Sequence, residues 1–148
     1  MTFARLTVLL LIMLLVGCAD GGLLARRGQP SPSAESLIML DGMELPVTTL
    51  LQGSVLYHRN DCRKCHYSGA RGGSEFGGPN LVDDEWFHCD GSINGIRSVI
   101  LKGITKEQLR GTERSPDRFM PSAAEMELSD ADVTAIAAYL YAIGQLDR

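Results

Sequence analysis

Two thiols and an imidazole stand within residues 62–66, at Cys62, Cys65 and His66. Side chains three apart on a helical turn lie on one side, so both thiols can reach the same edge of one flat ring. The neighbouring imidazole can bind a metal ion through a nitrogen lone pair. This C-x-x-C-H pattern is the attachment signature of haem c. It predicts one covalent haem c, held by thioether bonds at both cysteines and bound at its iron by His66.

A pair of cysteines at this spacing has other known uses. It can form a disulfide, supply half of a zinc site or act as a thioredoxin-like redox pair. A zinc site needs a second pair of ligands at matching spacing, and Cys89 with His88 or His58 is a poor substitute. A thioredoxin-like pair belongs to a βαβ unit, and no strand pattern lies nearby. Haem attachment is therefore favoured, with the disulfide as an alternative.

The iron of such a haem needs an axial ligand opposite His66, and Met120 is the candidate. It lies far along the chain from the motif, and Pro121 after it restricts the local backbone. Ligation by a histidine and a methionine raises the reduction potential. Many methionines are simply packing residues. The residues that compete with Met120 for this role are Met39, Met43, Met126, His58 and His88.

The N-terminus has the form of an export signal. A short basic start is followed by an apolar run over residues 6–16, too short to span a bilayer comfortably, and then by small residues. The tetrapeptide Leu15-Val16-Gly17-Cys18 resembles the lipobox of bacterial lipoproteins, in which the cysteine is acylated. This predicts a signal peptide over 1–17 and a lipid anchor at Cys18 on the periplasmic side of the cell envelope. The alternatives are an ordinary cleaved signal or an uncleaved anchor.

The rest of the chain divides into a tether and one domain. Residues 18–47 are predicted to be the lipidated N-terminus and tether. The passage from Gly21 to Ser36, rich in Pro and Ser, would span about 20–25 Å r.m.s. if flexible. Residues 48–148 are predicted to be an all-α domain without alternating strand patterns. The apolar periodicity and capping residues place helices over 50–60, from Ser92 to just before Gly103, and from Ser129 to Gly144. The first of these helices is expected to carry Leu51, Val55 and Leu56 on one apolar side, with Gly53 allowing close helix contact.

Residues 50–143 resemble a class I cytochrome c domain. The likeness rests on the C-x-x-C-H motif, Gly78-Pro79-Asn80-Leu81, Phe119-Met120-Pro121 and Ala137-Ala138-Tyr139-Leu140. It implies that the first and last helices cross, with Tyr57 and Tyr139 near the crossing. It also implies that the carbonyl of Pro79 accepts a hydrogen bond from the imidazole of His66. Residues 78–92 are similar to cytochrome subunits of certain haem–copper oxidases and quinoprotein dehydrogenases. Cys89 differs from these subunits, which usually have a glycine or another small residue at that position.

The expected function is one-electron transfer between redox proteins. An iron with both axial positions filled has no open site for a substrate, so the protein is expected to be a carrier or complex subunit and no enzyme by itself. The alternative is a c-type haem protein that binds a small gas because Met120 does not ligate. The formal net charge of −4, without a long run of like charge, gives no indication of nucleic-acid binding.

Charge placement suggests how a partner would be recognised. Basic residues outnumber acidic ones around the haem motif and before Met120, whereas acidic residues predominate after it. We hypothesise a basic rim that steers the protein towards an acidic partner. The basic residues concerned are Arg59, Arg63, Lys64, Arg71, Lys102, Lys106, Arg110, Arg114 and Arg118.

The lipid anchor is tested by replacing Cys18 with serine. The Cys18→Ser protein is expected to move from the membrane to the soluble periplasmic fraction, or to remain unprocessed, because no acyl chains can be attached. Cell fractionation with Cys89→Ser as the control measures this. Normal processing together with unaltered membrane attachment would contradict the prediction.

Overall fold

A computed structural model describes residues 36–73, 76–109 and 119–147 of the chain. These residues belong to one compact unit, Glu35–Arg148. Cys18 and the predicted signal peptide lie outside them. The elements are β1 (Leu37–Leu40), β2 (Met43–Pro46), α2 (Val47–Arg59), α3 (Cys62–His66), α4 (Ile93–Lys102), α5 (Lys106–Leu109) and α6 (Asp130–Leu146).

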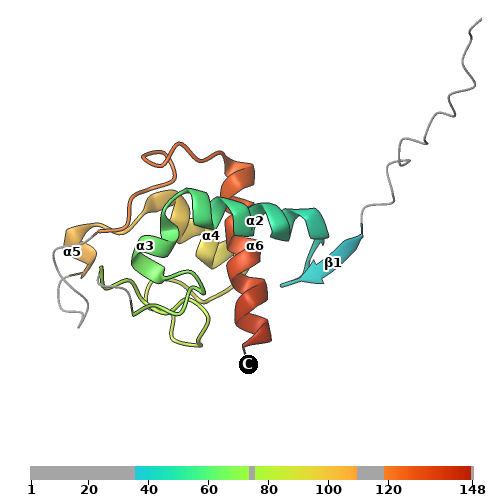
Figure 1. Ribbon diagram of the computed structural model, residues 1–148, viewed down its shortest axis with the longest axis horizontal. Coiled ribbons are helices and arrows are strands. Elements are labelled where there is room, and N and C mark those ends of the chain that lie inside the picture. The colour runs from blue at the N-terminus through green and yellow to red at the C-terminus, as the bar shows by residue number, and fades with distance from the viewer. Residues whose placement is uncertain (1–35, 74–75, 110–118, 148) are drawn as a thin grey trace, which may run out of the picture. The chain divides into compact units, whose positions relative to one another are not determined.

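The first and last helices of the domain cross, as the resemblance implied. Figure 1 shows α2 passing across α6. At the crossing Gly53 lies so close to α6 that a Cβ on it would stand 2.0 Å from the backbone oxygen of Ala135. The rings of Tyr57 and Tyr139 lie beside this contact, with centroids 5.8 Å apart. A glycine at this position is what lets the two backbones approach.

The buried face of α2 differs from the apolar face that was expected. Leu51 and Val55 are 65% and 54% exposed, whereas Gly53 and Tyr57 are buried. The expectation that Gly53 allows a close helix contact is confirmed, whereas the expected apolar side with Leu51 and Val55 is not the side that packs. The packing follows Gly53 because the absence of a side chain allows the closest contact with α6.

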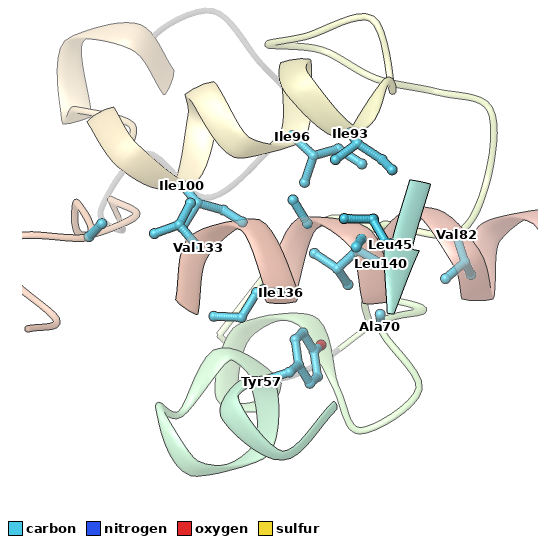
Figure 2. Packing of buried hydrophobic residues seen from close by; sticks show 13 residues of the cluster. Leu45, Tyr57, Ala70, Val82, Ile93, Ile96, Ile100, Val133, Ile136 and Leu140 are labelled. Carbon is cyan, nitrogen blue, oxygen red and sulfur yellow. The ribbon is translucent and has the colours of Figure 1, made fainter. Parts of the chain in front are cut away.

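The core lies between α4 and α6 and is closed by Tyr57 from α2 (Figure 2). The side chain of Ser92 accepts a hydrogen bond from the Gly95 backbone N–H, which confirms the expected start of α4. Ser129 and Asp132 form the expected capping box at the start of α6. The side chains that α4 and α6 contribute to the core are Ile93, Ile96, Ile100, Val133, Ile136 and Leu140.

The expected end of the last helix at Gly144 is wrong. Helix α6 continues to Leu146, and Gly144 is buried inside it. A Cβ at this position would lie 3.7 Å from the Cα of Val82, so the residue faces the backbone of a neighbouring loop. Gly144 therefore lies within the helix and does not end it.

The prediction of an all-α domain is too narrow. Strands β1 and β2 form an antiparallel hairpin in which Leu37 pairs with Pro46 and Leu40 with Met43. Asp41 and Gly42 adopt positive φ angles in the turn, and Asp-Gly is a strong signal for such a hairpin. The carboxylate of Asp41 accepts a hydrogen bond from the Ile93 N–H at 2.8 Å, which ties the hairpin to the start of α4.

About half of the described residues are therefore helical, and two short strands form one small sheet. None of the helices in residues 36–73, 76–109 and 119–147 is long and apolar enough to cross a membrane.

Replacing Gly53 by alanine tests the helix crossing. A free helix would gain about 1 kcal/mol from this change. The added methyl group would instead meet the backbone of Ala135, so we expect the folded protein to lose about 1–3 kcal/mol of stability. Denaturant unfolding of the haem-loaded protein measures this. Gly69→Ala is the control, since the nearest atom there is 3.8 Å away, and equal stability of the two variants would contradict the crossing.

Candidate haem-attachment site

The three motif residues lie on one short helix, α3. Its single turn places Cys62 and Cys65 three positions apart and ends at His66. Cys62 is a free thiol, so no disulfide joins the two motif cysteines. Burial raises the pKa of the Cys62 thiol to about 11, so it stays protonated at neutral pH. Because Cys62 and Cys65 are three positions apart on one helical turn, both thiols can attach to the same edge of one ring.

The orientation of the His66 imidazole is set by Pro79. Nδ1 of His66 lies 3.0 Å from the carbonyl oxygen of Pro79, which is the contact that the resemblance implied. A carbonyl oxygen can only accept, so Nδ1 must carry the hydrogen and donate it. The other nitrogen, Nε2, then holds the lone pair with which an imidazole binds a metal ion. Such a hydrogen bond also raises the basicity of the ligand.

A second set of hydrogen bonds holds the backbone directly after the motif. The hydroxyl of Tyr57 donates to the carbonyl oxygen of Tyr67 at 2.7 Å, and the N–H of Ala70 donates to the same oxygen at 3.1 Å. The N–H of Gly72 donates to the carbonyl of His66 at 3.0 Å. Burial raises the pKa of Tyr57 above its usual value, which keeps the hydroxyl protonated as a donor. The resemblance implied the place of Tyr57 near the helix crossing, whereas this hydrogen bond was not expected.

The loop that carries Pro79 runs directly against α3. A Cβ on Gly78 would lie 2.3 Å from the carbonyl oxygen of Cys65. Gly72 adopts a φ of +68°, and a Cβ there would meet the backbone of Asn80 and Pro79. These glycines let the loop approach the motif closely enough for the His66–Pro79 hydrogen bond.

A cavity of about 360 Å³ lies between these elements and α4 and α6. Cys62, Cys65, His66 and Met120 all line it, and the rest of its wall is mostly apolar. Two thiols, an imidazole and a thioether in an apolar cavity are the donor set that suits a haem and its iron. The residues therefore fit a covalently bound haem. Apolar wall residues include Leu81, Trp86, Val99, Phe119, Ile136 and Leu140.

Met120 is held in place by a short backbone bridge. Its N–H donates to the carbonyl of Ile104 at 3.0 Å, and the N–H of Ile104 donates back at 2.8 Å. Gly103, with a φ of +69°, allows this bridge, because a Cβ there would lie 2.5 Å from the carbonyl oxygen of Met120. Met120 thus reaches the cavity from a backbone anchored to the end of α4.

The cavity lining narrows the set of competing ligands. Met126 and His88 line the cavity, whereas Met39, Met43 and His58 do not. Nδ1 of His58 instead lies 2.8 Å from the carbonyl oxygen of Ser54 within α2. Met126 and His88 therefore remain as alternatives to Met120.

Trp86 and Cys89 line the cavity, whereas Arg97 contacts α6. Trp86 lines the cavity and packs over Gly91, where a Cβ would lie 2.6 Å from its ring. Arg97 donates a hydrogen bond to the hydroxyl of Thr134 at 3.1 Å and forms an ion pair with Asp130. Cys89 lines the cavity, and burial raises the pKa of its thiol.

Part of the hypothesised basic rim is paired with acidic side chains. Lys64 contacts Asp61 at 2.6 Å, and Arg71 forms an ion pair with Asp147. The basic residues 110, 114 and 118 lie outside the described part of the chain. The rim as a whole stays a prediction.

Together, the motif helix, the oriented imidazole and the apolar cavity define a c-type cytochrome domain. A family model described as cytochrome c oxidase, cbb3-type, subunit III matches residues 48–140. The chain therefore belongs to this family. Membership implies a covalently bound haem c and a role in electron transfer, as the sequence predicted.

Curated relatives agree with this assignment. The chain is 33% identical over 93 residues to the cbb3-type cytochrome c oxidase subunit FixPc of Rhizobium leguminosarum bv. viciae, covering 63% of this chain and 30% of that protein. It is 32% identical over 85 residues to subunit CcoP of Rhodobacter capsulatus, covering 57% of this chain and 26% of that protein. The chain thus spans about 26–30% of the length of these relatives. No solved structure matches it significantly.

Replacing Tyr57 by phenylalanine tests the bond that holds the end of α3. The variant keeps the ring in the core and loses the hydrogen bond to Tyr67, so we expect a loss of about 1 kcal/mol in unfolding free energy. Denaturant titration of the haem-loaded protein measures this. The control is Tyr141→Phe, because no hydrogen bond joins that hydroxyl to the described residues. A loss no larger than that of the control would contradict the role of Tyr57.

Proposed function

We propose that this protein is a one-electron carrier of the bacterial cell envelope with a single haem c. The haem is attached at Cys62 and Cys65, and its iron is bound by His66 and Met120 in a class I cytochrome c fold. Acylated Cys18 anchors the protein on the periplasmic side of a membrane. The proposal rests on the cavity, which is lined by both motif cysteines, His66 and Met120. In His66, Nε2 is the nitrogen that holds the lone pair.

When bound, the haem supplies an iron centre that accepts and releases one electron. The chain's own residues fix its environment. His66, oriented by Pro79, supplies the more basic ligand. The thioether of Met120 favours the ferrous state, which raises the reduction potential. Apolar side chains around the cavity limit access of water, which further shapes the potential.

With both His66 and Met120 bound to it, the iron would have no open position for bond chemistry. We therefore propose that it acts only by passing electrons between other proteins. The names of its relatives are those of oxidase subunits, which supports an oxidase as one of these partners. The alternative function, binding of a small gas, requires that Met120 leave the iron accessible.

Replacing Met120 by alanine tests the ligand. The variant is expected to keep its covalent haem but to show a markedly lower reduction potential, since axial ligands set potentials over a range of about 0.8 V. It should also bind carbon monoxide in the ferrous state, which the wild type should resist. Potentiometric titration and absorption spectra measure both effects.

Met126→Ala is the matched control, because Met126 lines the same cavity. Its potential and its resistance to carbon monoxide are expected to match the wild type. If Met126→Ala shows the changes and Met120→Ala does not, the ligand assignment is wrong. If the wild type itself binds carbon monoxide readily, the gas-binding alternative replaces the proposed carrier function.

A further inference from the structure

Five apolar side chains at the N-terminal end of the domain are exposed. On α2, Val47, Leu51 and Val55 recur every four residues and so form one stripe along the helix. On β1, Leu37 and Met39 are two residues apart and therefore lie on the same face of the hairpin, 56% and 63% exposed. We refer to these five residues as the apolar strip.

The two halves of the apolar strip are joined by the backbone. The N–H of Val47, the first residue of α2, donates to the carbonyl of Ser36 at 2.9 Å. Leu37, the first residue of β1, pairs with Pro46 directly before α2. The beginnings of β1 and α2 are therefore neighbours, and the strip runs from the hairpin onto the helix.

Charged side chains are sparse along the apolar strip. Helix α2 contains no aspartate, glutamate, lysine or arginine before Arg59. The carboxylate of Asp41 in the hairpin turn is directed to the backbone of Ile93 and so away from the strip. Two charged side chains lie close to the strip. Glu44 pairs with Met39 across the hairpin and so shares its face. Asp132 accepts a hydrogen bond from Gln52 at 3.3 Å. Single exposed apolar residues are ordinary, whereas a contiguous group of them marks a contact surface.

We propose that the apolar strip rests on the surface of the lipid bilayer. It begins at Leu37, directly after residues 21–36, the Pro- and Ser-rich part of the predicted tether to acylated Cys18, so the inference rests on the proposed lipid anchor. A tether of this kind keeps the strip near the membrane at an effective concentration in the millimolar range. A weak apolar contact is then sufficient to hold the domain against the head groups.

Contact through the apolar strip leaves the haem cavity accessible to a redox partner. None of the five strip residues lines the cavity. The exposed aromatic side chains of the cavity wall, Phe87 and Phe119, belong to other segments of the chain. The domain would therefore meet the membrane and its electron-transfer partner through different side chains.

The experiment measures how fast a charged, water-soluble maleimide alkylates a cysteine placed in the apolar strip. The haem-loaded, acylated full chain with Leu51→Cys is bound to phosphatidylcholine vesicles, and peptide mass spectrometry follows the reaction. The same variant with Cys18→Ser, which lacks the anchor, is the reference. Asn94→Cys on α4 is the control, because α4 and α2 lie on opposite sides of α6 (Figure 2) and Asn94 is exposed.

We expect the alkylation rate of Leu51→Cys to fall several-fold in the acylated protein, at low and at high salt, and that of Asn94→Cys to stay unchanged. An equal alkylation rate with and without the anchor would overturn the proposal. Protection of Leu51→Cys that grows with protein density on the vesicles would also overturn it, since a second copy of the protein would then cover the strip. The mass of the N-terminal peptide tests the anchor separately. Acylation without protection of Leu51→Cys rejects the strip contact alone, whereas missing acylation rejects the anchor.

Discussion

The close approach of α2 and α6 at Gly53 is the contact on which the haem site depends. It brings Tyr57 into the core beside α6, where its ring forms part of the cavity wall. The same residue holds the carbonyl of Tyr67, directly after the motif, through its hydroxyl. The helix crossing is thus linked to the backbone beside His66 by one side chain. A cofactor site with fixed ligand geometry needs this kind of support around its ligands.

The loop after α3 completes the site from the other side. Gly72 and Gly78 allow its backbone to run against α3, and Pro79 then accepts the hydrogen of His66. Gly103 does the same for Met120, whose backbone is tied to Ile104 at the end of α4. In each case the absence of a side chain permits a backbone contact, and that contact orients a candidate ligand. The described glycines therefore explain much of the site's geometry.

Local patterns could be predicted from the sequence, and contacts between distant segments mostly could not. The C-x-x-C-H motif and the caps at Ser92 and Ser129 depend on neighbouring residues, and their geometry is as expected. Gly53 was correctly expected to allow a close helix contact, but the exposure of Leu51 and Val55 was not, because it depends on where α6 packs across α2. Asp41-Gly42 did signal the hairpin, but the surrounding residues were taken for part of the tether. The hydroxyl contact of Tyr57 has no sequence signal, since it requires the fold itself.

Covalent attachment of one haem at the motif is the central claim of this account. It is tested most directly by protease digestion of the purified, denatured protein followed by mass spectrometry of the peptide that contains residues 62–66. This peptide is expected to carry the mass of one haem, and both of its cysteines are expected to resist alkylation. No other peptide is expected to be modified with haem. A peptide with two free thiols, or with a disulfide between Cys62 and Cys65, would contradict it.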